Sequence, residues 1–236
     1  MDEFKIKIIT RKSVPQNIGN PILQYIQDPE RKGSRLLCKI LKNSEEIGRG
    51  IILDFYKEFE IIEGFGNTYT KALDIHTVIG NKVYKLKYYK NPPLPSEIKS
   101  QYIDYFVNIF EKYLEFFIDK YGRENLILSC IPSSSKVPQE ISELLSKNTN
   151  VEKNDFISIN EDINISNKNI EDFDTAIECA KDKYVIDGSL LDNKKTHIII
   201  DDVFGMGASI MTVLDKLYEK TQKKNYFLII AKDVKR

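Results

Sequence analysis

The chain has 236 residues, of which 42% are hydrophobic and 30% are charged, enough for one sizeable α/β domain with an appended piece. Its 35 basic and 35 acidic residues give a formal net charge of zero, so no overall field favours nucleic acid or a membrane surface.

The cysteines and the apolar runs exclude further classes. Cys38, Cys130 and Cys179 lie far apart without a C-x-x-C pair, which indicates neither a disulfide framework nor a zinc ribbon. The N-terminal residues lack the pattern of a signal peptide, and no apolar run approaches the length of a membrane span. We therefore expect a soluble cytoplasmic protein.

Residues 1–90 are expected to form a small, β-rich N-terminal element. Short apolar or alternating runs predict strands, and clusters of glycine, serine and asparagine separate them. A short helix is expected near residues 22–27. The predicted strands are 4–10, 35–41, 50–55 and 59–62, and the predicted turns are 32–34, 48–50 and 64–67.

Two short segments close this element, ALDIHT at 72–77 and VYKLKYY at 83–89. We read the second as a strand with alternating lysines. Lys85 and Lys87, with Lys90, form either a basic rim that faces phosphate or nucleic acid, or a solvated strand face. His76 is either a ligand or base, or a structural histidine satisfied by hydrogen bonds, and we favour the structural reading.

A long helix is expected after the rigid break at 91–95, with Ser96 as its cap. Its apolar positions follow helical spacing. Such a stripe is more typical of a core or an interface than of base stacking, so it predicts core packing and leaves a homodimer open. The stripe comprises Tyr102, Tyr105, Phe106, Ile109, Phe110, Tyr113, Leu114 and Phe117.

An α/β core is predicted from residue 97 to residue 236. Its first strand is 126–131, and a serine-rich turn and a helix with Pro138 in its first turn follow. Hydroxyls and backbone N–H groups at a helix start suit an anion, and Lys136 adds a charge, although a plain helix cap has the same pattern. Residues 148–183 are polar without strong periodicity and predict a long loop.

The segment 197–218 organises the chain. Ile198-Ile199-Ile200 predicts a buried strand, Asp201 and Asp202 follow it, and an amphipathic helix is expected from Ser209. The apolar run at 226–231 predicts the next strand. In such strand–turn–helix–strand units, ligands lie outside the carboxyl ends of the strands.

A phosphorylated sugar fits this segment. Backbone N–H groups at the helix start can hold a phosphate, and Gly205 and Gly207 allow the main chain to approach it closely. Asp201 and Asp202 can accept hydrogen bonds from ribose hydroxyls, or hold Mg²⁺ through water.

Three alternatives share parts of this pattern. A Walker B strand also ends in acids, but the sequence has no G-x-x-x-x-G-K-[ST]. A receiver domain keeps its acidic pair on its first strand, whereas this pair is near the C-terminus. The third alternative is an acidic pair that caps a loop in an ordinary α/β domain.

The turn DDVFGMGAS at 201–209 resembles the phosphoribosyl-pyrophosphate (PRPP) loop of type I phosphoribosyltransferases, in which an apolar strand and two acids precede a Thr/Gly-rich turn ending in Gly-x-Ser/Thr. ALDIHT and the Y-x-L-K-Y pattern at 84–88 ahead of it resemble the ComF-like, competence-type branch. The resemblance covers roughly residues 70–236. Many ComF-like proteins begin with a zinc ribbon, which this sequence lacks.

The resemblance implies a phosphoribosyltransferase-like parallel sheet with flanking helices at 97–236, with residues 1–90 as a hood or interface. It implies Mg²⁺-dependent transfer of the 5-phosphoribosyl group from PRPP to a nitrogenous acceptor, under a mobile loop at 148–183 that excludes water. The resemblance makes Asp201 and Asp202 the catalytic and Mg²⁺-binding pair. The 5′-phosphate would be bound by Gly205, Met206, Gly207, Ala208 and Ser209. Pyrophosphate would be bound by Ser133, Ser134, Ser135 and Lys136, and Lys87 matches the family's lysine. Lys181, Lys183, Tyr184 and Val185 occupy a region that is often basic and then aromatic in the family.

Gly205 and Met206 replace the two threonines typical of that turn. Hydrogen bonds to a charged group contribute roughly 1.5–3 kcal/mol each, so their loss weakens phosphate binding by about ten-fold or more. The alternative is therefore a non-catalytic receptor for PRPP, for another ligand that contains ribose 5-phosphate or for a nucleotide, or a competence-type protein that handles single-stranded DNA. A structural protein without a ligand is the third reading, and the sequence does not identify an acceptor.

Overall fold

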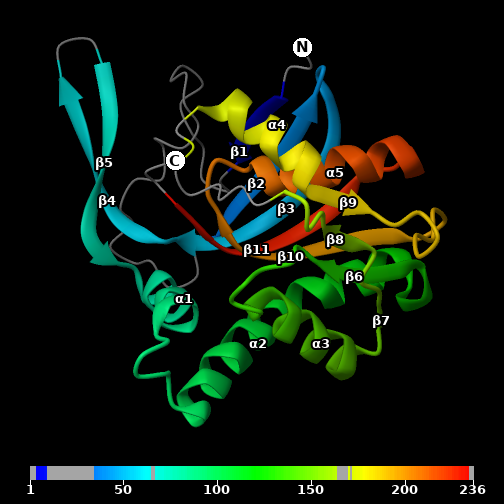
Figure 1. The fold of residues 1–236 in the computed structure, drawn as a ribbon, viewed down its shortest axis with the longest axis horizontal. Helices are drawn as coiled ribbons and strands as arrows, with labels where there is room; N and C mark the ends of the chain where they lie inside the picture. The colour runs from blue at the N-terminus through cyan, green and yellow to red at the C-terminus, as the bar shows by residue number, and fades with distance from the viewer. Residues whose placement is uncertain (1–3, 10–34, 65–66, 164–169, 171, 234–236) are drawn as a thin grey trace.

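The computed structural model describes residues 4–9, 35–64, 67–163, 170 and 172–233. They form an α/β fold whose central seven-stranded sheet has the order β1-β2-β3-β11-β10-β6-β7 (Figure 1). The predicted α/β class is thereby confirmed. The strands of this sheet are β1 (Phe4–Ile9), β2 (Leu36–Lys42), β3 (Glu45–Phe55), β6 (Leu126–Cys130), β7 (Glu152–Lys153), β10 (Thr196–Phe204) and β11 (Asn225–Lys232).

The sheet is mixed rather than wholly parallel. Strands β3, β11, β10, β6 and β7 run parallel to one another, whereas β2 pairs antiparallel with β3, and β1 with β2. The N-terminal strands and the C-terminal strands thus belong to one sheet, because β3 pairs directly with β11 from Gly48 to Phe55.

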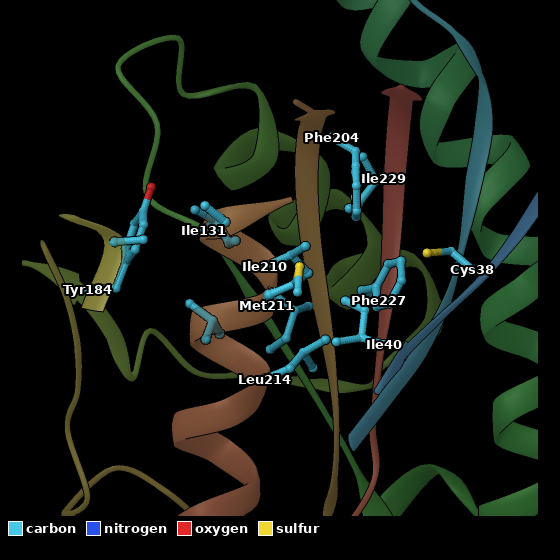
Figure 2. Close-up of a cluster of buried hydrophobic side chains, with 14 of the residues drawn as sticks. Cys38, Ile40, Ile131, Tyr184, Phe204, Ile210, Met211, Leu214, Phe227 and Ile229 are labelled. Carbon is cyan, nitrogen blue, oxygen red and sulfur yellow. The ribbon is translucent and has the colours of Figure 1, made fainter. Parts of the chain in front are cut away.

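Helices cover both faces of the sheet (Figure 1). Alternate residues of β10 supply both cores: Ile198 and Ile200 pack in the cluster that contains residues of α1, α2 and α3, and Ile199 packs in the cluster that contains residues of α4 and α5. Figure 2 shows the second cluster, where Met211 and Leu214 of α5 meet Phe227 of β11. The helices are α1 (Val78–Tyr88), α2 (Ser96–Tyr121), α3 (Val137–Thr149), α4 (Phe173–Lys183) and α5 (Ala208–Thr221), with a 3-10 turn η2 (Arg123–Asn125).

Two antiparallel ribbons lie outside the central sheet. One pairs β4 (Lys57–Gly64) with β5 (Asn67–His76) and extends away from the body of the molecule (Figure 1). The other pairs β8 (Ile157–Ile159) with β9 (Tyr184–Ile186).

The strand order reverses between β6 and β10. The chain moves from β6 through α3 to β7 on one side, and from β10 through α5 to β11 on the other. The carboxyl ends of β6 and β10 therefore flank a topological switch point, which is where open α/β sheets bind their ligands.

The predicted N-terminal strands are present, but one predicted turn is wrong. Gly48 and Gly50 lie inside β3, which begins at Glu45. A Cβ at Gly48 would lie 2.5 Å from Leu214, and one at Gly50 would lie 2.2 Å from the Phe227 carbonyl, so these glycines permit close packing instead of a turn. The helix near 22–27, the turn at 32–34 and the tip of the turn at 64–67 lie outside the described residues.

The predicted strand at 83–89 is a helix, α1. Thr77 caps it by accepting a hydrogen bond from the Gly80 backbone N–H at 2.9 Å. Ile79 and Val83 are buried four residues apart, which is helical spacing. Residues two apart on a helix point about 200° away from each other, so Lys85 and Lys87 do not form one basic rim.

Two further expectations are corrected. Residues 148–183 contain β7, β8 and α4 rather than one long loop; Asp172 caps α4 by accepting from the Thr175 N–H at 2.8 Å. Residues 164–169 and 171 lie outside the described residues. Ser96 is the first residue of α2 and not its cap, because Pro95 occupies the N-cap and provides no side-chain hydrogen bond.

Candidate functional site

Asp201 and Asp202 lie at the carboxyl end of β10, at the switch point of the sheet. They are part of the strand rather than of the turn after it, because β10 continues to pair with β11 as far as Phe204. Their exposed fractions are 7% and 4%, which is unusual for carboxylates and requires compensating partners.

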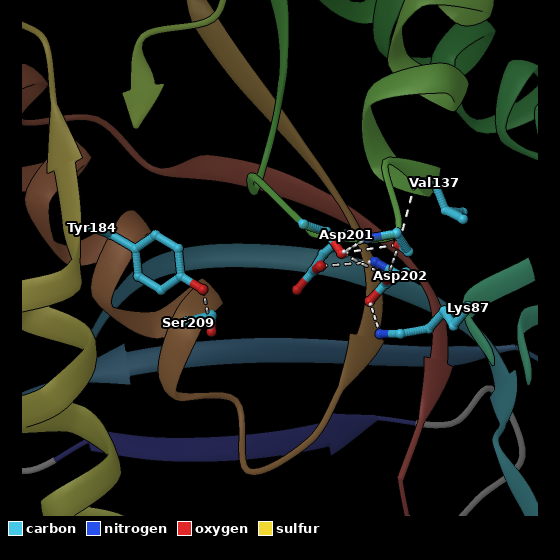
Figure 3. A network of polar contacts seen from close by, with 8 residues as sticks. Lys87, Val137, Tyr184, Asp201, Asp202 and Ser209 are labelled. Carbon is cyan, nitrogen blue, oxygen red and sulfur yellow. Dashed lines mark hydrogen bonds and ion pairs between the residues drawn. The ribbon is translucent and has the colours of Figure 1, made fainter. Parts of the chain in front are cut away.

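Asp202 joins three segments of the chain (Figure 3). Its Oδ1 lies 2.8 Å from Nζ of Lys87 on α1. Its Oδ2 accepts hydrogen bonds from the hydroxyls of Ser135 at 3.0 Å and Ser133 at 3.3 Å, both in the turn after β6. The structure therefore brings together residues that the sequence places in separate predicted sites.

The serine turn is organised around this carboxylate. The hydroxyl oxygens of Ser133 and Ser135 also lie 2.9 Å apart, and because each hydroxyl has one proton, a serine that donates to its neighbour does not donate to Asp202 at the same time. The Val137 N–H donates to the Ser135 hydroxyl at 3.3 Å. Ser134 and Lys136 are exposed. Lys136 adopts a left-handed conformation at the N-cap of α3 and provides no side-chain cap. The Val137 N–H is bonded to Ser135, Pro138 has no N–H, and the Glu140 N–H donates to the Lys136 carbonyl. The start of this helix therefore offers a ligand the exposed Lys136 and the Gln139 N–H.

Asp201 has a different environment. Its Oδ1 accepts a hydrogen bond from the Asp202 backbone N–H at 2.8 Å. Burial, and then the negative charge of Asp202, raise the pKa of Asp201 to about 8, so its carboxyl is mostly protonated at neutral pH. Burial lowers the pKa of Lys87, but the charge and hydrogen bond of Asp202 outweigh it and raise that pKa above its usual value.

The turn after β10 leads into α5, which begins at Ala208 and not at Ser209 as predicted. Gly207 is the N-cap residue; its φ of 89° is left-handed, a conformation that favours glycine, and it supplies no side-chain cap. The first N–H groups of α5 are thus left for another acceptor. The Ser209 hydroxyl hydrogen-bonds the hydroxyl of Tyr184 on β9 at 3.1 Å (Figure 3).

The positions that lack the usual threonines differ in their surroundings. A Cβ at Gly205 would have no atom within 4 Å, so a larger side chain would fit there. Met206 packs against the cluster of α4 and α5. Burial raises the pKa of Tyr184 to about 12, so its phenol remains a neutral hydrogen-bonding group.

Lys232, at the end of β11, is a residue that the sequence did not single out. Its side chain is buried, and its Nζ donates to the Gly205 carbonyl at 2.8 Å and to the Asp233 carbonyl. The sequence does place this lysine at the end of an apolar strand, which could have indicated its burial, but a lysine in that position is usually exposed to solvent.

The other predicted candidates lie around this site without joining it. The His76 ring stacks on Tyr84 with centroids 4.6 Å apart and meets Tyr56 edge-on at 4.9 Å. Among the described residues His76 therefore makes ring contacts and not the expected hydrogen bonds. Burial and Lys57 lower the pKa of His76. Lys85 is half-buried and Lys90 exposed; Lys181 and Val185 are exposed, and the Lys183 ammonium lies 5.5 Å from the Tyr184 ring centroid.

The acidic pair does not form a metal site of its own in the part of the chain that the structure describes. No group of three or more histidine, cysteine or acidic side chains that could hold a metal occurs among the described residues. Both oxygens of Asp202 have hydrogen-bond donors, and Asp201 is mostly protonated. Mg²⁺ commonly keeps several waters and binds through one or two carboxylates plus substrate phosphates, so Asp201 and Asp202 are the residues that would hold it with such a ligand.

Within the part of the chain that the structure describes, no helix is both long and apolar enough to cross a bilayer. Comparison with known protein families finds no match to the chain. Comparison with curated proteins also finds none.

Proposed function

We propose that the chain binds PRPP with Mg²⁺ at the carboxyl ends of β6 and β10 and transfers the 5-phosphoribosyl group to a nitrogenous acceptor. The observation that carries the proposal is the junction at Asp202, where an acidic strand end contacts the turn before α3 and lies one turn away from the uncapped start of α5. Two helix starts on either side of two acids match a sugar with phosphate groups at both ends.

Each part of the site has a role in this function. Asp201 and Asp202 accept hydrogen bonds from the ribose hydroxyls, and the N–H groups of the turn at 205–209 hold the 5′-phosphate. Ser134, Lys136 and the Gln139 N–H at the start of α3 hold pyrophosphate. The hydroxyls of Ser133 and Ser135 become available to it only when they turn away from Asp202.

Transfer would be mainly electrostatic catalysis. The C–O bond between ribose C1 and pyrophosphate breaks, the acceptor nitrogen forms the new bond to C1, and pyrophosphate leaves as a polyanion. Mg²⁺ bound to that polyanion would neutralise charge. The chain's own contribution is to orient the ribose through the acids and to stabilise the leaving group through N–H donors and Lys136.

Calorimetry tests the binding part of the proposal. Asp201→Asn with Asp202→Asn should abolish binding of Mg²⁺–PRPP, because the variant loses the acceptor charges for the hydroxyls and the cation. The matched control is Asp104→Asn with Asp119→Asn, which removes two exposed acids from α2 and should leave binding unchanged. Equal affinity in the acidic-strand variant and the wild type would reject this site.

A non-catalytic receptor for the same ligand is the second candidate. Two observations favour it. Gly205 and Met206 lack the two hydroxyls that threonines would offer to a phosphate. The carboxylate of Asp202 is already bonded to Lys87, Ser133 and Ser135. Pyrophosphate release from PRPP, measured across a panel of purine and pyrimidine bases, separates the two. Binding without release for every base would support the receptor and reject the transferase.

A single-stranded DNA partner has less support from these contacts. Lys87 is engaged with Asp202, so it does not face solvent beside Lys85 and Lys90 as a phosphate-binding row. A salt-dependent gel shift with the three lysines neutralised tests this partner, because phosphate contacts release counterions.

A further inference from the structure

Lys232 is the most deeply buried lysine of the described residues, with an exposed fraction of 2%. A buried ammonium is costly unless its protons are bonded. Here they are directed to main-chain carbonyls, those of Gly205 at 2.8 Å and of Asp233. The Nζ also lies 5.5 Å from the centroid of the Phe204 ring. The chain thus places a positive charge directly behind the turn between β10 and α5.

This contact fixes the direction of the peptide group between Gly205 and Met206. The peptide is trans, because the cis bond in the described residues is Asn91–Pro92. In a trans peptide the C=O and N–H point in opposite directions. Since Lys232 holds the Gly205 carbonyl on the inner side of the turn, the Met206 N–H is directed outward, ahead of the N–H groups at the start of α5.

We propose that Lys232 is a positioning residue, which holds the Gly205–Met206 peptide with its N–H outward and places a positive charge behind the turn that receives the 5′-phosphate. This inference rests on the proposed function for its ligand, but the hold on the turn is a property of the ligand-free chain. The ammonium acts through the backbone and does not touch the ligand. The charge of Lys232, on the buried side of the turn, replaces part of the attraction for phosphate that threonine hydroxyls at positions 205 and 206 would supply on the ligand side.

The surroundings of Lys232 make this device sensitive to pH. Burial lowers the pKa of Lys232 to about 8, although the Asp233 carboxylate acts in the opposite direction. Burial raises the pKa of Cys38 to about 12, so this thiol stays neutral in the range where Lys232 titrates. As pH rises through about 8, Lys232 loses its proton, the attraction for an anion falls, and the grip on Gly205 weakens.

The first measurement concerns the ligand-free turn. In Lys232→Met, amide hydrogen exchange of Met206 and Gly207 should become faster than in the wild type, since the Gly205 carbonyl loses its donor. Lys220→Met is the matched control, because Lys220 is exposed on α5. Unchanged exchange in a folded Lys232→Met would overturn the positioning role. If that variant does not fold, Lys232→Leu, which also has no donor for the Gly205 carbonyl, takes its place in the same comparison.

The second measurement is ribose 5-phosphate affinity by calorimetry between pH 7 and 9, in an Asp201→Asn background that removes the acid of this site whose pKa is also about 8. Lys232→Met should bind at least about ten-fold more weakly at pH 7 and should lose the fall in affinity above pH 8. Lys232→Arg should keep the affinity and also lose the fall, because a guanidinium stays protonated.

The outcomes separate the two ideas. Binding that is equal in Lys232→Met and its parent would overturn the anion role of Lys232 while leaving the proposed function intact. If neither the wild-type chain nor the Asp201→Asn variant binds ribose 5-phosphate or Mg²⁺–PRPP, the proposed function fails and the anion role of Lys232 fails with it. The exchange data then still decide whether Lys232 holds the turn.

Discussion

Lys87 and Asp202 form an ion pair with 2.8 Å between Nζ and Oδ1, across 115 positions of the sequence. The pair fastens α1 to the carboxyl end of β10, beside the serine turn that contacts the other oxygen of the same carboxylate. A helix from the N-terminal half thus contributes a charge to the acidic site in the C-terminal half. The position of α1 and the electrostatics of the site are therefore linked.

The first prediction concerns this ion pair. Lys87→Met should lower the free energy of unfolding by about 1–3 kcal/mol, because it leaves the Asp202 charge buried with only hydroxyl donors. Lys90→Met removes an exposed lysine two residues after the helix and should change stability by less than about 0.5 kcal/mol. Urea unfolding measures both. A double-mutant cycle with Asp202→Asn should give a favourable coupling energy, and additive effects would show that the contact does not stabilise the fold.

The second prediction concerns pH and Asp201. Its pKa is about 8 in the folded chain but about 3.9 in an unfolded one. Between these values the folded state binds the extra proton, so the contribution of Asp201 to the free energy of unfolding must fall as pH rises from about 4 to about 8. Asp201→Asn removes the titrating group, and its free energy of unfolding relative to the wild type should rise steadily over this range.

Thermal or urea unfolding at pH 5, 6, 7 and 8 measures that difference. Asp119→Asn, an exposed acid on α2, is the control and should track the wild type. Parallel curves for Asp201→Asn and the wild type would mean that Asp201 is ionised across the range and is not destabilised by burial.

The third prediction concerns the vacant space at Gly205. This residue does not have a positive φ, and a Cβ there would meet no atom within 4 Å. Gly205→Thr should therefore fold normally and restore one hydroxyl to the phosphate turn. A hydrogen bond to a charged group contributes roughly 1.5–3 kcal/mol, so the affinity for ribose 5-phosphate should rise about ten-fold or more.

The control for this gain is Gly205→Val, which has a similar shape without the hydroxyl. It should bind no better than the wild type. Equal gains in the two variants would assign the effect to the backbone and not to the hydroxyl. A loss in both would show that the phosphate does not approach this side of the turn.

The elements around the site were predictable where local pattern and tertiary environment agree. Ile198-Ile199-Ile200 is apolar on both sides of the strand because helices cover both faces of the sheet, so a continuous run was the correct signal. The serine turn and the acids were each predicted to follow a strand, and they lie on one edge because β6 and β10 are parallel neighbours, a pairing that the sequence did not predict. Their contact through Asp202 follows from that arrangement.

Other features depend on contacts that no local pattern contains. In α1, lysines alternate with tyrosine and leucine as they do in an exposed strand, and the helix becomes clear only from the burial of Ile79 and Val83. Gly48 and Gly50 resemble turn residues because their tight neighbours, Leu214 and Phe227, are far along the sequence. The burial of Lys232 and the raised pKa of Asp201 likewise follow from the assembled layers.

The last prediction concerns the proton of Asp201 during ligand binding. At pH 7 this carboxyl is mostly protonated in the ligand-free chain. If Mg²⁺–PRPP binds with its cation near Asp201, the positive charge favours the carboxylate, and close to one proton should leave on binding. Calorimetric enthalpies in buffers of different ionisation enthalpy should then vary linearly, with a slope of about one proton at pH 7 that shrinks above pH 8. Asp201→Asn should remove the slope, whereas Asp119→Asn should keep it. A wild-type slope of zero would mean that Asp201 stays neutral in the complex, and that any cation is held by the ligand and Asp202 without it.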